Sequence, residues 1–521
     1  MNELSSKTTT RRSGGRAARR AQRAAPLSRD KRPIRPGMTG GHYKPLSDLD
    51  MLRIHENALQ ALEQIGLADA PPSGIEILTK AGAILDKNGR IRFPRALVED
   101  MLAVAATNIT LSARDPQFDL DLSGSRVHYG TAGAAVHMVD VGGRDYHDST
   151  LQDLYDAAKI SNTLDNIHFL QRPMICRDVK DNHEMDLNTI YACCSGTSKH
   201  IGTSFTEPAF VPSALEMLHM IAGDEATWRA RPFVSNSNCF VVPPMRFATE
   251  SCEVMEACIR GGMPVLLLSA GMAGATAPST VAGAITQAVA ECLAGVVYVN
   301  ALAPRHPAIF GTWPFGLDLR TGTMTGGSGE QALLTAGCAQ MHAFYGLPGG
   351  APAGISDAKT PDMQAGWEQM CSNVMAGLSG LNMVYEAAGM HASLLGFCHE
   401  SLILGDDLIG QALRCVRGIE VTDDTCALEE MREVCLGRDG IEGVGHYLGM
   451  DQTLELMESN HVYPALGNRM SPKEWAEQNR PDLIASATKR KEEILAVPSA
   501  AAFDPRIDAE IRAKFNIYLA P

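Results

Sequence analysis

PVLLLSA, at Pro264–Ala270, is one of four short apolar runs that decide the fold of this chain. The other three are Pro232–Phe240, Ala308–Trp313 and Asn382–Glu386. All four are too apolar to be strands with one face in water. Between Ile167 and Leu404 about eight such runs alternate with Gly-, Ser- or Pro-rich corners and helix-like stretches. Buried strands separated by helices form a parallel sheet, and about eight units predict a closed (β/α)8 TIM-type barrel.

The chain of 521 residues is longer than one barrel, so further elements must flank it. We expect a disordered basic arm at 1–38, an N-terminal helical and β-hairpin cap at 39–150, the barrel at 151–418 and a C-terminal helical extension at 419–521. The arm is rich in Arg, Ala and Ser and cannot bury enough apolar surface to fold alone. The run Phe397–Leu404 is the expected eighth unit, although only about ten residues separate it from Glu386.

Composition excludes some classes of function. The net charge of −14 combines +9 in residues 1–36 with −23 in the remainder, which disfavours nucleic-acid binding by the body. The apolar stretch Val281–Val299 is interrupted by Gln287 and Glu291, so we expect no membrane span. Thirteen cysteines without framework spacing indicate reduced thiols and a cytoplasmic location. The sequence leaves the oligomeric state open, and a homo-oligomer is compatible with it.

The chemistry of such a barrel lies at the C-terminal ends of its strands. Charged and polar candidates at these ends are Arg172, Glu207, Asp357, Glu386 and His391, and the aromatic candidates are Trp313, Phe315 and Tyr385. Aromatic residues make up only 6% of the chain, so their concentration here is informative. Rings with a carboxylate bind a quaternary ammonium, each ring contributing about 0.5–2 kcal/mol when desolvated. The competing interpretation is that the rings only pack the top of the barrel.

Motifs for other chemistry are weak. The sequence has no G-x-S-x-G or H-E-x-x-H motif, so no catalytic residue and no metal ligand is assigned. The closest local cluster of metal-ligand types is Cys398-His399-Glu400. Asp181 to Asp186 partly matches D-x-H-x-x-G, by which cobalamin domains offer an axial histidine, but Asp186 replaces the glycine. We interpret His183 as part of a helix start, so any corrinoid must be carried by another protein.

A set of segments in a fixed order resembles a known family over about residues 45–495. They are Met263–Gly271, Ala273–Pro278, Gly350–Lys359, Asn382–Gly389, Val462–Pro464, Arg469 and Trp475. Together they resemble the trimethylamine:corrinoid methyltransferase family. The resemblance implies a barrel enzyme that passes a methyl group from a methylamine to Co(I) of a separate corrinoid protein, with no tightly bound cofactor of its own.

One departure from the family pattern bears on the substrate. The trimethylamine enzyme uses a pyrrolysine within its barrel, and this sequence has none, although Ser356–Lys359 lies near the expected position. The resemblance is therefore to the branch without pyrrolysine, which implies a quaternary amine such as glycine betaine, carnitine or proline betaine. A quaternary ammonium already leaves as a neutral tertiary amine, so the protein only has to bind the cation, exclude water and orient one methyl group.

In this interpretation Trp313, Phe315 and Tyr385 hold the cation and Glu386 balances its charge. Arg172 would bind a carboxylate of the substrate and His391 would orient it. Glu207 and Asp357 are further candidates. Three different functions stay open: a trimethylamine methyltransferase, a metal-dependent barrel lyase or hydrolase, and a non-catalytic protein that binds a betaine.

Overall fold

The structure is a computed structural model that describes residues 27–438 and 440–520. Two compact units make up the chain. One consists of Pro36–Gly418 with Pro464–Pro521, and the other consists of Met1–Arg35 with Ile419–Tyr463. Most of the predicted disordered arm, residues 1–26, lies outside the described residues. Its described end holds the short 3-10 helix η1 (Arg29–Lys31) and, in the first unit, strand β1 (Met38–Thr39).

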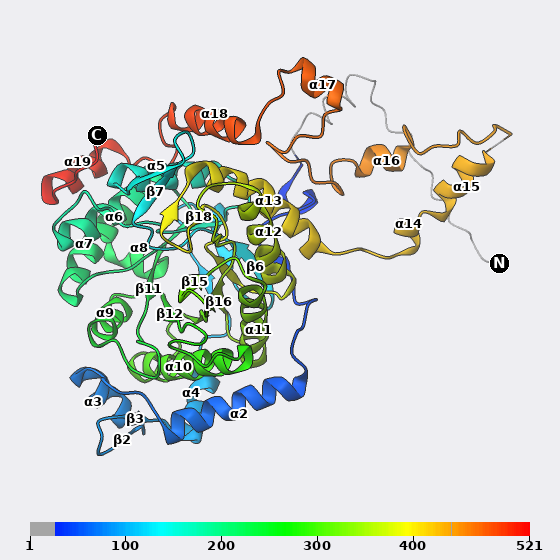
Figure 1. Ribbon diagram of the computed structural model, residues 1–521. Helices are drawn as coiled ribbons and strands as arrows, with labels where there is room; N and C mark the ends of the chain where they lie inside the picture. The colour runs from blue at the N-terminus through cyan, green and yellow to red at the C-terminus, as the bar shows by residue number, and fades with distance from the viewer. Residues whose placement is uncertain (1–26, 439, 521) are drawn as a thin grey trace, which may run out of the picture. The chain divides into compact units, whose positions relative to one another are not determined.

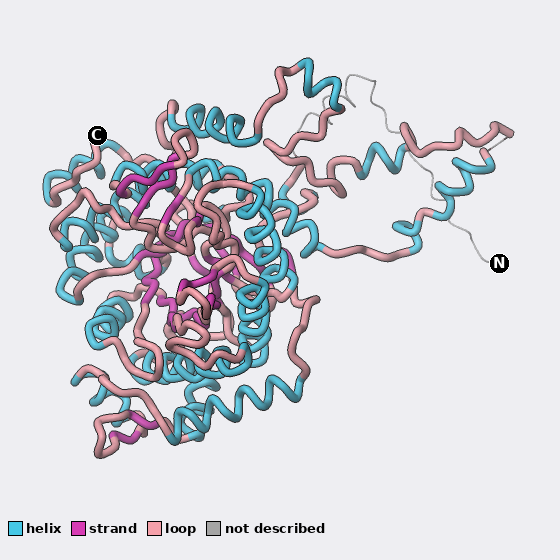
Figure 2. The backbone as a smooth tube through the Cα atoms, viewed as in Figure 1, coloured by secondary structure: helices cyan, strands magenta, loops and turns pink. Residues whose placement is uncertain are grey.

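The first unit is built around a barrel of eight parallel strands (Figures 1 and 2). In order around the barrel they are β6 (Arg126–Tyr129), β9 (Phe169–Gln171), β10 (His200–Thr203), β11 (Val234–Asn238), β12 (Val265–Ser269), β13 (Ala308–Thr312), β16 (Gly350–Pro352) and β17 (Met383–Tyr385). Strands β9 to β13 form one continuous parallel sheet. The parallel bridges Gly130↔Phe169 and Phe310↔Gly349 join it to β6 and to β16. Pairing of β17 with β6 closes the ring, which confirms the predicted TIM-type barrel.

One helix follows each barrel strand and covers its outer face. These helices are α5 (Leu151–Thr163), α6 (Asn182–Gly196), α7 (Val211–Ala222), α9 (Thr249–Arg260), α10 (Val281–Leu302), α11 (Gly329–Tyr345), α12 (Met363–Leu378) and α13 (His399–Arg417). Every residue of β12 is buried, as expected for a strand between a filled barrel interior and a helix layer. Helix η3 (Pro208–Phe210) precedes α7, and α8 (Glu225–Ala230) follows it.

The two ends of the predicted barrel differ from the structure. The barrel begins with β6, before the predicted boundary at residue 151, and it ends with β17 rather than with a strand at Phe397–Leu404. The β6 sequence Arg-Val-His-Tyr contains no apolar run. Its polar side chains make hydrogen bonds at the amino end of the strand, as His128 does with the carbonyl of Asp121. Residues from His399 onward belong to α13, which is the eighth barrel helix.

A small mixed sheet lies in the loops that follow the first and last barrel strands. The predicted hairpin is present as β7 (His137–Asp140) and β8 (Asp145–Asp148). Strand β19 (Gly396–Phe397) pairs with β7, and β18 (Met390–His391) pairs with β19. Because these strands come after the carboxyl ends of β6 and β17, the sheet belongs to the mouth of the barrel. The loop that follows β13 forms a second hairpin, which consists of β14 (Gly316–Asp318) and β15 (Thr323–Thr325).

Helices from both ends of the chain cover the outside of the barrel (Figure 1). Helices α2 (Asp48–Gln64), α3 (Pro72–Lys80) and α4 (Arg95–Val104) pack on α10, and α18 (Leu483–Leu495) packs on α5 and α13. Near them lie α17 (Pro472–Glu477), α19 (Pro505–Lys514), η2 (Pro116–Phe118) and the short strands β2 (Ile84–Leu85), β3 (Ile91–Arg92), β4 (Thr110–Leu111) and β5 (Leu120–Asp121). Helix α10 is long and apolar enough to cross a membrane, but 72% of its apolar window is buried in the protein, as in a core helix.

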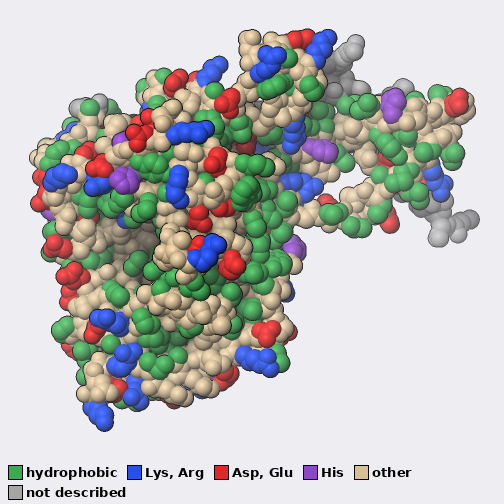
Figure 3. Space-filling model, viewed as in Figure 1, with side chains coloured by type: hydrophobic (Ala, Val, Ile, Leu, Met, Phe, Trp, Pro, Cys, Tyr) green, Lys and Arg blue, Asp and Glu red, His purple; other side chains and the backbone are tan. Residues whose placement is uncertain are grey.

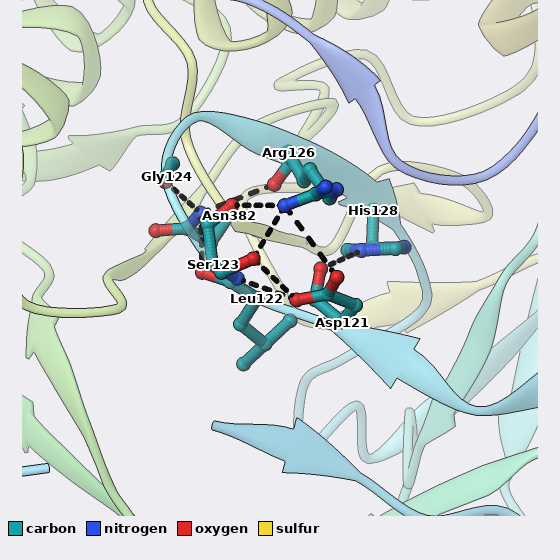
Figure 4. A network of polar contacts seen from close by, with 7 residues as sticks. All are labelled: Asp121, Leu122, Ser123, Gly124, Arg126, His128 and Asn382. Atoms are coloured by element: carbon teal, nitrogen blue, oxygen red, sulfur yellow. Dashed lines mark hydrogen bonds and ion pairs between the residues drawn. The ribbon is translucent and has the colours of Figure 1, made fainter. Parts of the chain in front are cut away.

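Hydrogen bonds at the amino ends of the strands close the floor of the barrel (Figure 4). Asn382, just before β17, donates Nδ2 hydrogen bonds to the carbonyls of Leu122, Gly124 and Arg126 at 2.8–3.1 Å. Its Oδ1 accepts the N–H of Gly349, just before β16, at 3.0 Å. One amide side chain therefore ties together three segments that enter neighbouring strands.

Candidate active site at the barrel mouth

Three aromatic rings from different strands meet inside the upper barrel. The ring centroid of Tyr385, the last residue of β17, lies 5.2 Å from that of Trp313, which directly follows β13. On its other side Tyr385 lies 5.1 Å from Phe169 of β9. Each of the three side chains is at most 5% exposed. The rings form a continuous aromatic wall, which we call the ring cluster.

Glycines in neighbouring strands make room for these rings. A Cβ on Gly350 would lie 2.6 Å from the ring of Tyr385, and a Cβ on Gly130 would lie 2.5 Å from the ring of Phe169. Both distances are too short for a real contact, so larger residues would push the rings out of place. Glycine at these two positions therefore admits aromatic side chains to the barrel interior.

Glu386 follows Tyr385 and is held in an unusual state. Its backbone has φ of 59°, a left-handed conformation that a non-glycine residue rarely adopts. The side chain is 1% exposed, and in the part of the chain that the structure describes its Oε2 atom has no hydrogen-bond partner. Burial raises the pKa of the carboxyl group to about 8. A buried carboxyl oxygen without a described partner, in the residue that follows Tyr385, marks Glu386 as a candidate ligand-binding group.

Arg172 and Cys239 extend the site to the ends of β9 and β11. Arg172 donates from Nη2 to the hydroxyl of Ser204 at 2.9 Å, and its Nε has no hydrogen-bond partner among the described residues. Cys239 has exposed surface, yet desolvation raises the pKa of its thiol to about 11. Arg172 lowers this pKa and Glu386 raises it, so both charged groups lie within electrostatic reach of the same thiol.

Phe315 and Asp357, two of the predicted site residues, contact neighbouring loops of the protein. Phe315 lies in the loop after β13, where it pairs with Met272 through the backbone, and within the described residues its ring contacts no other ring. The carboxylate of Asp357 accepts hydrogen bonds from the N–H of Gly326 at 2.8 Å and from the hydroxyl of Ser393 at 2.6 Å. Asp357 therefore fastens the loops that follow β13, β16 and β17 to one another.

The two remaining candidates are not joined to the ring cluster by any contact in the described structure. His391 lies on β18 and shares a hydrogen bond of 2.7 Å between its Nε2 and the hydroxyl of Ser401. Burial lowers the pKa of His391 to about 4, partly offset by a backbone hydrogen bond at Ala358, so the ring is neutral at physiological pH. Glu207 is exposed, at the start of η3.

The sequence interpretation missed Phe169 and Cys239. Phe169 lies within a short apolar strand, and only the register of β9 against Gly130 shows that its ring enters the barrel. Cys239 follows the unusual polar strand Val-Ser-Asn-Ser-Asn, and that polarity was an available signal. The side chain of Leu267 in β12 lies next to Gly295 of α10, on the outer face of the sheet. Asn238 pairs with Leu267 and therefore also faces outward. Side chains alternate along a strand, so the next residue, Cys239, faces the mouth of the barrel.

The residues considered for other chemistry have separate surroundings. His399 Nε2 lies 3.0 Å from the carbonyl of Asp153, while Glu400 forms an ion pair with Lys491 at 2.5 Å. Over residues 27–438 and 440–520, no group of three or more His, Cys, Asp or Glu side chains is arranged to hold a metal ion. His183 lies in the first turn of α6, which Asp181 caps, as the helix-start interpretation predicts.

Comparison with known proteins identifies the family. The model of the trimethylamine methyltransferase (MTTB) family matches residues 12–516. The chain therefore belongs to the trimethylamine methyltransferase family, which confirms the resemblance carried by its sequence segments and makes the protein a methyltransferase. The match extends beyond the barrel to the flanking helices on both sides.

Individual relatives cover nearly the whole chain. It is 28% identical over 473 residues to the glycine betaine methyltransferase of Desulfitobacterium hafniense strain Y51, covering 90% of this chain and 96% of that protein. It is 28% identical over 481 residues to the trimethylamine methyltransferase MttB of Methanosarcina thermophila, covering 91% and 98%. The crystal structure of the Methanosarcina barkeri monomethylamine methyltransferase MtmB aligns with a TM-score of 0.51 at 10% identity over 90% of each chain, which supports the shared fold.

Proposed function

We propose that this protein transfers a methyl group from a small quaternary amine that also carries a carboxylate, such as glycine betaine, to the Co(I) corrinoid of a separate protein. The observation that carries the proposal is the buried, unpaired carboxyl of Glu386 beside the ring cluster. Membership of the family supplies the class of reaction, and the similarity to a glycine betaine methyltransferase supports this substrate class.

The cation would bind against the ring cluster. The faces of Trp313 and Tyr385 attract an N-methylated ammonium, which cannot donate hydrogen bonds and so cannot be held by polar groups alone. Glu386 is neutral in the empty site at pH 7 because its pKa is about 8. A cation beside it would favour the carboxylate, so binding would release a proton and leave a neutral ion pair.

The carboxylate of the substrate would bind at Arg172, whose Nε–H has no hydrogen-bond partner among the described residues. Arg172 and Glu386 both influence the pKa of the Cys239 thiol. A zwitterion would place its cation beside Glu386 and its carboxylate beside Arg172. Choline or trimethylamine would leave the guanidinium without its anion.

The reaction itself needs little from the protein. The reduced corrinoid of the partner protein is the nucleophile: its bond to the methyl carbon forms as the carbon–nitrogen bond breaks, and the nitrogen leaves with the electron pair as a neutral tertiary amine. No proton has to be supplied, which agrees with the absence of a pyrrolysine and of a nucleophile–base pair in the sequence. The ring cluster and Glu386 would fix the direction of one methyl group and exclude water.

The corrinoid protein would dock on the rim of the mouth. Exposed large apolar side chains there are Leu319 on the β14–β15 hairpin, Met363 and Trp367 at the start of α12, and Leu395 between β18 and β19. Their exposed fractions run from 58% to 82%. In Figure 3 hydrophobic side chains gather on the viewed face where Figure 1 labels α12. We define these four residues as the apolar rim, and such patches mark docking surfaces.

The test is a methyl-transfer assay with purified protein and chemically reduced Co(I) cobalamin, followed by the absorbance change to methyl-Co(III). Glycine betaine, carnitine, proline betaine, choline and trimethylamine are added separately. We expect conversion with a betaine and not with trimethylamine. Conversion with trimethylamine alone would show the trimethylamine activity instead.

A binding protein and a metal-dependent enzyme would give distinct outcomes. Binding of a betaine without conversion, even with a cognate corrinoid protein, would indicate a non-catalytic binding protein. An activity lost with a stoichiometric metal on chelation would indicate the lyase or hydrolase. We also propose that the protein works in the cytoplasm, because all thirteen cysteines are free in the structure and eight are buried thiols.

A further inference from the structure

Strand β11 presents polar side chains to the interior of the barrel. Asn238 donates from Nδ2 to the carbonyl of Ser251 in α9 at 2.9 Å, so it faces the helix layer. Because side chains alternate along a strand, Ser237 faces the interior. Along this inner face Ser235 is buried, Ser237 is half-buried and Cys239 is exposed. Exposure therefore rises toward the mouth, and solvent reaches the barrel interior as far as Ser237.

Gln171 of β9 faces the same interior. It lies two residues beyond Phe169, whose ring belongs to the ring cluster, and alternate residues of a strand share a face. Its amide lies over Gly202 of β10, because a Cβ on Gly202 would lie 1.6 Å from Oε1 of Gln171. Gly202 is paired with Gln171 on one side and with Ser235 on the other. The absence of a side chain at Gly202 therefore lets the amide of Gln171 extend toward β11.

Both side chains have unused hydrogen-bonding groups. The amide of Gln171 and the hydroxyl of Ser237 make no hydrogen bond within residues 27–438 and 440–520. Gln171 is only 5% exposed, and a buried amide normally has a hydrogen-bond partner. We call Gln171 and Ser237 the polar pair. Two neutral donors that face a solvent-accessible interior are suited to a polar ligand.

The strand order places part of the polar pair across the mouth from Glu386. Strand β11 is the fourth and β17 the eighth around the barrel, so they lie half a turn apart. Glu386 follows β17, and it raises the pKa of the Cys239 thiol after β11, so its charge is felt at that side. A ligand in the mouth would therefore meet rings and a carboxyl group at one end and neutral donors at the other.

We propose that the polar pair binds the carboxylate of the substrate and thereby selects zwitterionic amines over simple cations. This inference rests on the proposed function. A carboxylate has about four acceptor sites on its two oxygens, which the Nε–H of Arg172 alone does not satisfy. Nε2 of Gln171 and the hydroxyl of Ser237 supply further hydrogen bonds, while Arg172 supplies the charge.

Calorimetric titration with two ligands tests this assignment. The ligands are glycine betaine and tetramethylammonium, a cation without a carboxylate, and the full-length protein is used without any corrinoid. Ser237→Ala and Gln171→Met should each raise the Kd for glycine betaine about 10- to 100-fold, as expected for a lost hydrogen bond to a charged group. The Kd for tetramethylammonium should stay at the wild-type value. Ser251→Ala and Gln152→Met, outside the barrel interior, are the matched controls and should bind both ligands like the wild type.

The variant Gln171→Glu separates lost binding from structural damage. Its carboxylate would repel that of glycine betaine and attract a cation, so the Kd should rise for glycine betaine and fall for tetramethylammonium. Equal weakening of both ligands, or wild-type affinity for glycine betaine in Ser237→Ala and Gln171→Met, would overturn the role of the polar pair alone. A wild type that binds tetramethylammonium as tightly as glycine betaine, or binds no betaine, would overturn the proposed substrate class together with this inference.

Discussion

Several buried polar groups at the two ends of the barrel differ in their partners, although Ser379 Oγ, in the segment that enters β17 at the floor, also has no hydrogen-bond partner among the described residues. At the floor, Asn382 satisfies its whole amide with four backbone groups, and the buried ammonium of Lys199 donates to the carbonyls of Ser161, Leu164 and Ile167. At the mouth, Glu386 Oε2, Trp313 Nε1 and Arg172 Nε have no hydrogen-bond partner within residues 27–438 and 440–520. Because an unpaired buried polar group costs about 1–3 kcal/mol, the floor is built for stability and the mouth for a ligand that completes it.

This difference gives each end its own expected mutational signature. Substitutions at the floor should lower the free energy of unfolding and leave the turnover of the folded enzyme unchanged. Substitutions at the mouth should lower activity and leave stability unchanged, or even raise it, because they remove groups that have no partner in the free protein.

The largest effect is expected for Glu386→Gln. Loss of the buried carboxylate opposite the cation should lower kcat/KM about 100- to 1,000-fold, since unpairing a buried charge costs roughly 3–4 kcal/mol. The measurement is steady-state methyl transfer with the best betaine of the substrate series. Glu99→Gln, at an exposed position, is the matched control. An E386Q variant with wild-type kcat/KM would remove Glu386 from the site.

The same substitution should raise stability above neutral pH. Burial raises the pKa of Glu386 from 4.5 to about 8, so the folded state binds the proton more tightly than the unfolded state. Its contribution to stability is therefore complete below pH 4.5 and is lost as the pH rises through about 8. The difference between the thermal unfolding midpoints of E386Q and the wild type should therefore be larger, in favour of E386Q, at pH 9 than at pH 6. Equal differences at the two pH values would contradict the buried, unpaired carboxyl.

The next effect belongs to the floor. Asn382→Ala removes four hydrogen bonds between segments that enter β6, β16 and β17, and should lower the free energy of unfolding by about 2–4 kcal/mol. Denaturant titration measures this change, with the exposed Asn57→Ala as control. The activity per folded molecule should stay at the wild-type level. A selective loss of activity would show that the two ends are coupled.

A smaller effect separates the two aromatic candidates at the mouth. Trp313→Leu removes one face of the ring cluster and should raise KM for the betaine about 5- to 30-fold, from roughly 1–2 kcal/mol of lost cation–π attraction. Phe315→Leu should change KM less than about twofold, because its ring lies apart from the cluster. If Phe315 proved as sensitive as Trp313, the three-ring cage expected from the sequence would be correct.

The smallest effect is expected at the apolar rim. The variant Met363→Ser/Trp367→Ser/Leu395→Ser should raise KM for a corrinoid protein severalfold, and leave transfer to free cobalamin unchanged. The comparison of the two methyl acceptors in one assay isolates docking from chemistry. Equal losses with both acceptors would mean that these residues act on the site itself.

The sequence was sufficient to predict the barrel and to place two candidate site residues close together. Apolar runs such as Pro264–Ala270 are strands buried on both faces, and that pattern does not depend on tertiary detail. It also placed Trp313 and Tyr385 at one mouth, where their rings indeed meet. Strand β6 was missed because His128 is buried by a specific hydrogen bond to the Asp121 carbonyl, which no periodicity reports.

The remaining parts of the site depend on register and loop contacts. Phe169 enters the barrel because Gly130 lies beside it, and the hydrogen bonds of Asp357 to neighbouring loops are not readable from the sequence. The protonation of Glu386 also has no sequence signature. Its pKa follows from complete burial without a partner, which is a property of the assembled mouth.

The most direct test of the central claim, that a cation completes the mouth at Glu386, is proton release on binding. Calorimetric titration with glycine betaine at pH 7 measures the number of protons released on binding. It is carried out in buffers of different ionisation enthalpy and without any corrinoid. Because burial raises the pKa of Glu386 to about 8 in the free protein, we predict release of most of one proton per bound betaine, and none for E386Q. Binding with no proton release in the wild type would contradict the account.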